Sequence, residues 1–410
     1  ERQRLIEEYN DSQHEVFVRA LPIGFNAMLE KTLTSIAGGV PPDIISLDGG
    51  VIHQLAPEGL FLPLEDLIDN NPLLGEQAYF PHIWPMVYFN HHLWGMPTTC
   101  DAICLVWNKE AFRKAHLDPE HPPATIAELE EYASKLTVCG ADGAIEQMGY
   151  LPWIPWDQTD MWGSVFGGHW FDKESGWCVC GKDPGIIAAF AWQKSFTRDP
   201  KSDHNPPYAM NPAMVSAFSK GMGEYMSAQN PFYSGKIAMT MEGEWQVAFI
   251  PKFAPGLDWG VAPLPYPEGV APIGYGLTVV VDAVPSTARH PEAAKKFLRW
   301  FYSPRSDTGI SPVSDFNERI RNIPPKKEDA LQDRFMQHPK FGVFVRQLLD
   351  KPVAALAVTP VARYFTDQIE RQRERVVMGE ATPEQAAREV EEMTNRELAR
   401  VRNMQERRKQ

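Results

Sequence analysis

The sequence predicts an α/β protein with two domains. At 410 residues the chain is too long for one ordinary hydrophobic core, so two domains are expected. Short apolar runs bounded by turn residues, which are typical of buried strands, alternate along the chain with stretches of helical period. Hydrophobic residues make up 43% of the chain and charged residues 23%, which is the balance of a folded protein.

The first fifty residues predict helix, strand, helix and strand in turn. Residues 2–9 place apolar side chains among charges, which indicates an amphipathic helix. Residues 15–21 alternate between apolar and polar, as a half-buried strand does. Residues 25–37 return to a helical period that ends at two glycines, and residues 44–47 form a short apolar strand.

Asp48 and Gly49 follow that last strand directly. In open α/β sheets, ligands bind at the carboxyl ends of strands, so both residues are candidates for ligand contact. A carboxylate at this point is equally suited to cap the next helix, which runs to Leu55. Both interpretations of Asp48 stay open on the sequence alone.

The middle of the chain predicts another strand followed by helices. Residues 102–108 are mostly apolar and begin just after Asp101, and a helix starts near Asn108. Further on, Thr125 precedes a helical stretch and Glu128 follows three positions later. That spacing predicts a capping box, in which each side chain bonds the backbone N–H of the other residue.

Residues 232–250 contain the most informative aromatic residue. A turn precedes the apolar run 237–241, Gly243 ends it, and a helix begins near Glu244. Trp245 is therefore expected at the edge of a sheet beside a helix N-terminus, as a platform for ligand or as a core residue under that helix. Glu244 is a further candidate there, although it also suits the helix N-terminus electrostatically.

Tryptophan is unusually frequent, with 12 in the chain and five between Trp153 and Trp177. Cores are filled more simply by Leu and Ile, which have no indole N–H to satisfy. Flat aromatic faces suit the C–H faces of a pyranose, while carboxylates accept hydrogen bonds from its hydroxyl groups. Aromatic and acidic residues together therefore favour a carbohydrate ligand.

Charge and cysteine content exclude several classes of partner. The chain has 40 basic and 53 acidic side chains, a net charge of −13, which argues against nucleic acid or an anionic membrane surface. No apolar run approaches the roughly 18 residues of a membrane span. The spacing of Cys178 and Cys180 lacks the second ligand pair of a zinc site. Because the chain opens on Glu1 within an expected helix, we expect an N-terminal piece to be missing.

Seven segments occur in the order and at the intervals of one known family: IAGGVPPDIISLDGG, LFLPLEDLI, WGMPTTCDAICLVWNKEAF, ATIAELEEYASKL, FGG, GKIAMTMEGEW and APIGYGLTVVV. On these segments the sequence resembles the extracellular solute-binding proteins of carbohydrate ABC importers, the family of maltose-binding protein. The resemblance extends from the first residues to about Leu398. The first β-strand of the family is absent from the chain.

The resemblance implies a type II periplasmic-binding-protein fold, in which a hinge joins two discontinuous α/β lobes and the ligand binds in the cleft. It implies an N-terminal lobe of residues 1–108 and 265–312 and a C-terminal lobe of residues 109–264 and 313–410. Residues 311–327 depart from the family pattern, so no ligand contact is carried over from them.

The resemblance also implies a non-enzymatic receptor, periplasmic or on the extracellular face of the membrane, with lipid anchoring left open. Such a receptor captures a mono- or oligosaccharide by hinge closure and delivers it to the permease subunits of an ABC importer. It acts as a monomer without cofactor, metal ion or nucleic acid. The candidate ligand-binding residues are Asp48, Gly49, Asp101, Trp153, Trp156, Trp162, Glu244, Trp245, Gly274 and Tyr275.

Two other functions fit part of this pattern. A glycoside hydrolase also combines carboxylates with aromatic platforms, but Glu242 and Glu244 have no second carboxyl set opposite them by the sequence. A receptor for a cationic solute such as a polyamine shares the fold and suits the acidic net charge. Its binding should weaken steeply with salt.

Overall fold

The computed structural model describes residues 1–409 except 25–26, 70, 156–157, 278 and 356. The chain divides into two compact units, and each unit is assembled from three separate segments. Unit 1 consists of Glu1–Ala102, Gly276–Val345 and Val358–Ala362, and unit 2 of Ile103–Tyr275, Arg346–Ala357 and Arg363–Gln410.

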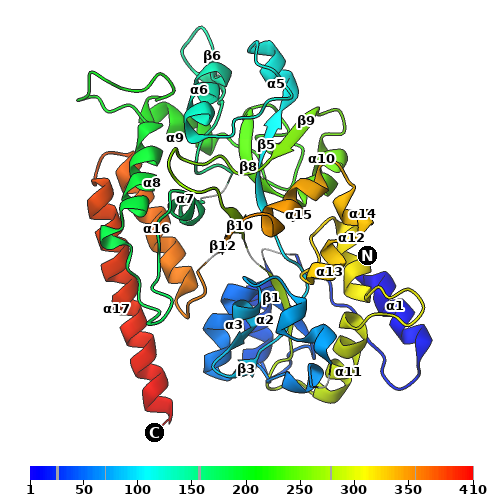
Figure 1. Ribbon diagram of the computed structural model, residues 1–410. Coiled ribbons are helices and arrows are strands. Elements are labelled where there is room, and N and C mark those ends of the chain that lie inside the picture. Colours follow the sequence, from blue (N-terminus) through cyan, green and yellow to red (C-terminus); the bar gives the residue numbers. More distant parts are fainter. Residues whose placement is uncertain (25–26, 70, 156–157, 278, 356, 410) are drawn as a thin grey trace. The chain divides into compact units, whose positions relative to one another are not determined.

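Unit 1 combines short strands with helices (Figure 1). Its strands are β1 (Ile45–Asp48), β2 (Tyr88–Phe89), β3 (His92–Leu93), β4 (Met96–Pro97) and β11 (Val280–Ala283). Its helices are α1 (Arg2–Ser12), α2 (Met28–Ala37), α3 (Gly49–Leu55), α4 (Trp84–Val87), α11 (Pro291–Tyr302), α12 (Pro312–Ile320), α13 (Lys327–Ala330) and α14 (Asp333–Met336), with 3-10 turns η2 (Ala56–Glu58), η3 (Glu65–Leu67), η4 (Pro72–Leu74) and η5 (Glu76–Ala78).

The main sheet of unit 1 has the order β1-β11-β4, and both pairs are antiparallel. Asp282 on β11 is a buried carboxylate and is 0% exposed. Arg2 forms an ion pair with Asp282, and Ser46 and Tyr302 donate hydrogen bonds to it at 2.6 and 3.0 Å. A buried charge is stable only with such partners, so this network fixes α1 to the sheet.

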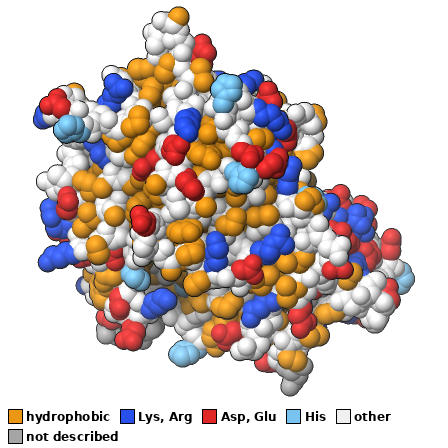
Figure 2. Space-filling model, turned by 45° about the horizontal axis from the view of Figure 1, so that its top comes forward, with side chains coloured by type: hydrophobic (Ala, Val, Ile, Leu, Met, Phe, Trp, Pro, Cys, Tyr) orange, Lys and Arg blue, Asp and Glu red, His pale blue; other side chains and the backbone are white. Residues whose placement is uncertain are grey.

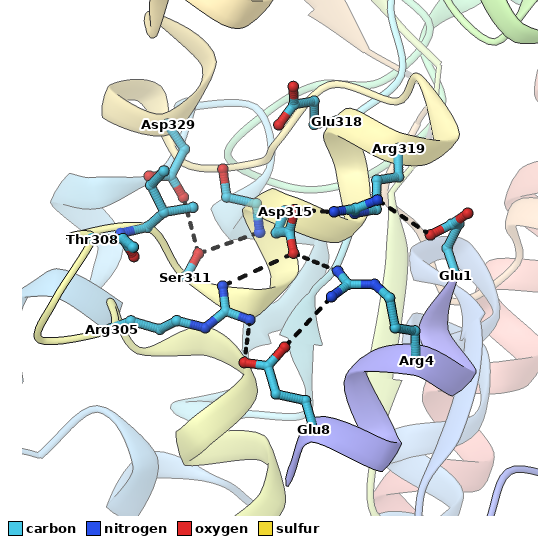
Figure 3. Close-up of polar contacts among 12 residues, drawn as sticks. Glu1, Arg4, Glu8, Arg305, Thr308, Ser311, Asp315, Glu318, Arg319 and Asp329 are labelled. Atoms are coloured by element: carbon cyan, nitrogen blue, oxygen red, sulfur yellow. Dashed lines mark hydrogen bonds and ion pairs between the residues drawn. The ribbon is translucent and has the colours of Figure 1, made fainter.

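A second ionic network joins α1 to α12 (Figure 3). Arg4 contacts Asp315 of α12 at 2.6 Å, and Arg305 contacts Glu8 of α1 at the same distance. Arg319 of α12 bonds Asp315 as well, at 3.2 Å. Residues 1–12 and 305–319 are therefore held together by alternating charges, although almost 300 positions separate them in the sequence.

Unit 2 also mixes helices and strands. Its strands are β5 (Ile103–Asn108), β6 (Val138–Cys139), β7 (Ile145–Gln147), β8 (Met239–Gly243), β9 (Trp259–Ala262) and β12 (Val353–Ala355). Its helices are α5 (Lys109–Lys114), α6 (Ile126–Leu136), α7 (Thr159–Val165), α8 (Pro184–Ser195), α9 (Pro212–Lys220), α10 (Gln246–Phe253), α16 (Ala362–Val377) and α17 (Pro383–Lys409), with the 3-10 turn η6 (Cys180–Lys182). The unit boundaries fall within β10 (Gly274–Gly276), α15 (Phe341–Leu349) and the start of α16.

The sheet of unit 2 has the order β8-β5-β9, with β5 antiparallel to both neighbours (Figure 1). All six residues of β5 are buried, as expected for a central strand. The register pairs Ile103 with Gly243, so β8 ends beside the first residue of β5. The capping box predicted at Thr125 and Glu128 is confirmed at the start of α6.

The long C-terminal helix α17 packs on α8 and α16 in unit 2 (Figure 1). Ala386, Ala387 and Val390 of this helix are fully buried against Ile186 and Phe190 of α8. Beyond these residues charges dominate the helix, and the guanidinium of Arg402 lies 4.2 Å from the ring centroid of Trp177.

The lobe boundaries implied by the resemblance differ from the observed units. The first transition falls before β5 rather than after Asn108, because β5 is the central strand of unit 2. Residues 265–275 belong to unit 2 and residues 313–345 to unit 1. In the latter segment Asn317 donates a hydrogen bond to the Thr98 carbonyl at 2.7 Å, and Ile323 forms a β-bridge with Cys100.

The strand predicted at residues 15–21 is also wrong. The structure gives residues 16–24 no regular secondary structure, and Phe17 is 82% exposed. Instead, the side chain of Asn10 bonds both the N–H and the carbonyl of Val18, at 2.8 Å each. These bonds satisfy the backbone locally, where a strand would need a neighbouring strand.

The surface carries charges of both signs. On the face drawn in Figure 2, Lys and Arg side chains are interspersed with Asp and Glu side chains. Among the helices built from described residues, none is long and apolar enough to cross a membrane. All five cysteines are free thiols, and Cys139 is the exposed one.

Candidate ligand-binding residues

In unit 1, Asp48 and Asp101 lie at the same end of the sheet. Asp48 is the last residue of β1, and its Cα partner is Val280, the first residue of β11. On the other side of β11, the Thr98 N–H donates to the Val280 carbonyl at 2.6 Å. The carboxyl ends of β1 and β4 thus meet at one edge, with Asp101 four residues beyond the end of β4.

Asp48 occupies the N-cap position of α3 but makes no side-chain capping hydrogen bond to that helix. Asp48 therefore has the position of a helix cap but does not make the capping hydrogen bond. Gly49 is buried and donates its N–H to the Val279 carbonyl at 3.0 Å. A Cβ at this position would lie 3.0 Å from a Val279 methyl group, so the glycine is required for close packing.

Asp101 is 6% exposed, and its Oδ1 accepts a hydrogen bond from the Asn322 amide at 2.9 Å. The β-bridge between Cys100 and Ile323, their neighbours in the sequence, places Asp101 and Asn322 side by side. Asn322 therefore orients the Asp101 carboxylate. No motif marks Asn322 for this role, because it lies in the segment that departs from the family pattern.

In unit 2, Trp245 is the N-cap residue of α10, at the end of β8 as predicted. It is half-buried, and its indole N–H donates to the Tyr225 hydroxyl oxygen at 2.8 Å. A Cβ at Gly243 would lie 2.0 Å from the indole Cζ3 of Trp245. Gly243 is thus needed because the indole lies against its α-carbon.

Glu244 is 0% exposed, unlike its neighbour Trp245. Burial raises the pKa of the Cys104 thiol on β5, the charge of Glu244 raises it further, and Lys351 opposes the shift. Glu244 and Lys351 therefore lie within electrostatic reach of one strand. No motif marks Lys351 in the sequence.

The other predicted tryptophans have different environments. Trp153 is half-buried, and the Arg373 guanidinium lies 5.4 Å from its ring centroid. Trp162 is 0% exposed in α7, and its ring centroid lies 4.5 Å from that of Trp192. Protein covers the ring of Trp162, which favours a role in the core of unit 2 over stacking on a ligand. Trp156 lies outside the described residues.

Gly274 and Tyr275 serve packing within unit 2. A Cβ on Gly274 would lie 2.0 Å from the Gln347 carbonyl oxygen, and the Gly274 N–H donates to the Pro352 carbonyl at 2.9 Å. Tyr275 is 1% exposed, and its hydroxyl donates to the Asp160 carboxylate. Burial raises the pKa of Tyr275 and the Asp160 charge raises it further. The expected ligand contact of Tyr275 is not supported by this buried position.

The arrangement offers binding groups rather than a metal centre. Unit 1 has Asp48 and Asp101 at the end of its sheet, and unit 2 has buried Glu244 and the half-buried indole of Trp245 at the end of its sheet. Within the described part of the chain, no group of three His, Cys, Asp or Glu side chains is placed to hold a metal ion. The chemistry available is hydrogen-bond acceptance and aromatic stacking.

Known proteins with similar sequences are binding proteins of transport systems. The sn-glycerol-3-phosphate-binding periplasmic protein UgpB of Escherichia coli K12 is 26% identical over 332 residues, which are 75% of this chain and 68% of UgpB. The ABC transporter extracellular-binding protein PH1214 of Pyrococcus horikoshii is 23% identical over 355 residues, covering 81% of this chain and 71% of PH1214.

Solved structures confirm the two-lobed α/β fold of type II. CpMnBP1 with mannotriose bound has a TM-score of 0.80 and 26% identity, covering 96% of this chain and 95% of that one. The sugar-binding protein MalE of Xanthomonas citri has a TM-score of 0.75 at 19% identity, covering 98% and 95%. The sequence pattern described as bacterial extracellular solute-binding protein matches residues 2–308. The chain therefore belongs to the bacterial extracellular solute-binding proteins.

Proposed function

We propose that this protein is an extracytoplasmic receptor that binds a mono- or oligosaccharide and delivers it to an ABC permease. The observation that carries the proposal is the half-buried indole of Trp245, held against Gly243 at the end of β8. A flat ring fixed in this way suits the C–H face of a pyranose. CpMnBP1, a similar protein, has been solved with mannotriose and with mannobiose.

The acidic candidate residues favour a ligand that donates hydrogen bonds. Asp48 and Asp101 in unit 1 accept hydrogen bonds, which suits the hydroxyl groups of a sugar. Among the other candidate tryptophans, Trp153 is half-buried, and we propose it as a second stacking residue. Capture by hinge closure follows the mechanism that the family resemblance implies.

A second candidate ligand is sn-glycerol 3-phosphate, because UgpB is described as binding it. The carboxylates at three candidate positions, Asp48, Asp101 and Glu244, would repel a phosphate. Like charges in a poorly solvated site cost free energy, so we place this ligand second. A polyamine would suit the carboxylates as well, and the salt dependence of its binding distinguishes it from a sugar.

We infer no catalysis. Relatives are solute-binding proteins, and a hydrolase would need a second carboxyl group facing Glu242 across a substrate. Incubation with chromogenic glycosides is the direct check. Release of the chromophore above the level of a heat-treated sample would overturn this part of the proposal.

The test of the ligand is a thermal-shift screen followed by calorimetry. Mannobiose, mannotriose, maltotriose, sn-glycerol 3-phosphate and spermidine form the panel. A ligand present at about 100 times its dissociation constant stabilises the folded state by about 2.7 kcal/mol. Stabilisation by a sugar supports the proposal. Stabilisation by the phosphate or the polyamine alone contradicts it, and for spermidine the affinity would fall steeply with added salt.

A further inference from the structure

A chain of polar side chains leads from Trp245 into the interior of unit 2. Tyr225 and Tyr233 come from the segment between α9 and β8, Glu242 from β8, and Gln246 from α10. Glu242 and Gln246 are 0% exposed and Tyr233 is 9% exposed. None of these residues belongs to the proposed ligand contacts except through Trp245.

The hydrogen bonds in this chain have fixed directions. The Tyr225 oxygen accepts from the Trp245 indole N–H at 2.8 Å and from the Gln246 amide nitrogen at 3.2 Å. A phenol oxygen has two lone pairs and one proton, so both lone pairs are used. The proton of Tyr225 is donated to Glu242 Oε2 at 2.6 Å.

The far end of the chain is fixed in the same way. The Gln246 amide nitrogen faces Tyr225, so its carbonyl oxygen faces Tyr233, whose hydroxyl donates to it at 2.5 Å. Tyr225 therefore bonds the Trp245 indole directly, whereas the hydrogen bond of Tyr233 leads to Trp245 through Gln246 and Tyr225. Tyr233 lies one hydrogen bond further from Trp245 than Gln246 does, but removal of its hydroxyl also deprives Gln246 of one hydrogen-bond partner.

Glu242 accepts the hydrogen bond from Tyr225, and this bond determines the direction of the other hydrogen bonds among these side chains. Its Oε1 has no hydrogen-bond partner among the described residues. Leaving a buried carboxylate oxygen unpaired is destabilising, and apolar side chains would fill the same space without that cost. Glu242 therefore adds little to the stability of a core. It does hold the Tyr225 hydroxyl in one direction, so the Tyr225 oxygen is a fixed acceptor for the Trp245 indole N–H.

We propose that Tyr225 and Glu242 are positioning residues, which hold the Trp245 indole in the orientation that stacks on a sugar. The inference rests on the proposed function, because it takes stacking to be the role of Trp245. Tyr225 bonds the indole, and Glu242 orients the only proton of Tyr225. Without this bond, ligand binding must order the side chain, which should weaken affinity roughly three- to tenfold.

The first test compares Tyr225→Phe with Tyr233→Phe by calorimetry with mannotriose. Each change removes one hydroxyl and leaves Gln246 short of one partner, so both should lower the ligand-free melting temperature. Tyr225→Phe should weaken binding roughly three- to tenfold and Tyr233→Phe less than about twofold. Equal loss of affinity in the two variants, or none in Tyr225→Phe, overturns the positioning role.

The second test needs no ligand. In protein labelled with 5-fluorotryptophan, the Trp245 resonance is identified in the 19F spectrum by its absence from Trp245→Phe. It should shift or broaden in Tyr225→Phe and stay unchanged in Tyr233→Phe. An unchanged resonance in Tyr225→Phe overturns the inference even if mannotriose does not bind, and the expected change supports it even if the proposed function fails.

Titration of the same resonance tests Glu242. Burial raises the pKa of Glu242 to about 7, and the hydrogen bond from Tyr225 lowers it less. The other titratable groups facing it are Tyr225, Tyr233 and, across the strand pair, Cys104. Burial raises the pKa values of both tyrosines and of Cys104, so none of these three should titrate near neutral pH.

The Trp245 resonance should therefore follow one titration near pH 7 in the wild-type protein. Glu242→Gln keeps a carbonyl acceptor for Tyr225 but has no proton to lose, so the titration should disappear and the resonance stay sharp. A titration that persists in Glu242→Gln would come from another group and would overturn the role given to Glu242.

Discussion

The same residue type has opposite environments at Trp162 and Trp245. The ring of Trp162 is enclosed by aromatic neighbours in unit 2, including Trp192. The ring of Trp245 lies against the α-carbon of Gly243 and is only half-buried. One ring therefore stabilises the fold, and the other has a surface left for a ligand.

Replacing each ring by alanine separates these roles. We expect Trp245→Ala to weaken sugar binding by roughly 2–4 kcal/mol, as loss of an aromatic anchor does, with little change in stability. Trp162→Ala is the matched control and should lower the free energy of unfolding by roughly 3–5 kcal/mol through the cavity it leaves. Melts without ligand and calorimetric titrations measure both. A large fall in the ligand-free melting temperature of Trp245→Ala, with binding retained, would contradict the platform.

Asp101 provides a second prediction at this scale. Its carboxylate is held by the Asn322 amide at 2.9 Å, so it is oriented before ligand binds. Asp101→Ala should weaken sugar binding by roughly 1.5–3 kcal/mol, the range for a hydrogen bond to a charged group. Asp66→Ala removes an exposed carboxylate from the same unit and should leave the affinity unchanged. Equal affinities for the two variants would make Asp101 a structural residue.

At the scale of the elements, α1 depends on its ionic contacts with α12 (Figure 3). Burial raises the pKa of Asp315, but the Arg4 and Arg319 guanidinium groups outweigh this and lower it overall. A carboxyl group with a lowered pKa stabilises the fold above its unfolded pKa, about 3.9, and loses that contribution as the pH falls through its folded pKa.

Asp315→Asn should therefore lower the free energy of unfolding at neutral pH. The Asp315 side chain is 17% exposed and that of Arg4 is 43% exposed, so solvent screening limits the effect to about 0.5–1 kcal/mol. Urea titrations of mutant and wild type should converge as the pH is lowered towards about 3. Glu7→Gln, an exposed change on α1, should have no such pH dependence. A constant difference at all pH values would rule out the ion pairs as its cause.

Elements with local signals could be predicted from the sequence, and those that depend on distant partners could not. Thr125 and Glu128 start α6 through contacts within four residues. The alternation of residues 15–21 has the pattern of a strand, but Asn10 satisfies the backbone there instead. Alternation describes how side chains would face a sheet and does not say whether a neighbouring strand exists.

The same distinction between local signals and distant partners applies to the candidate site residues. Asp48, Asp101 and Trp245 were identified because each lies just before or after a predicted strand, and the structure places each near a strand end. Asn322 lies 221 positions from Asp101, and Tyr225 lies 20 positions from Trp245, so no local pattern marks either contact. The excess of tryptophan was interpreted as ligand contact, although Trp162 belongs to the core.

For the whole molecule, the distribution of thiols gives a prediction that covers both units. Cys100, Cys104, Cys178 and Cys180 are buried, and Cys139 is exposed. Burial raises the pKa of Cys104, which lowers its reactivity further. A thiol reagent should therefore modify one cysteine in the native protein and five in guanidinium chloride. Cys139→Ser should abolish the native reaction, and fewer than five reactive thiols after unfolding would reveal a disulfide.

The division into units could be predicted only in outline. The resemblance implied two discontinuous lobes, and the structure has two discontinuous units. The segment 313–345 was misplaced because its contacts with Thr98 and Cys100 are made across more than 200 positions. Such contacts depend on the folded arrangement and leave no periodicity in the sequence.

The strand order β1-β11-β4 has a consequence for the newly made chain. The central strand, β11, begins at Val280, whereas the strands on either side of it end at Asp48 and Pro97. During synthesis the ribosome must therefore add almost 200 residues after β4 before this sheet can close. Until then β1 and β4 have no common partner, and such long-range pairing is slow to form. The nascent chain should remain extended and open to chaperones or export machinery until most of it has been translated.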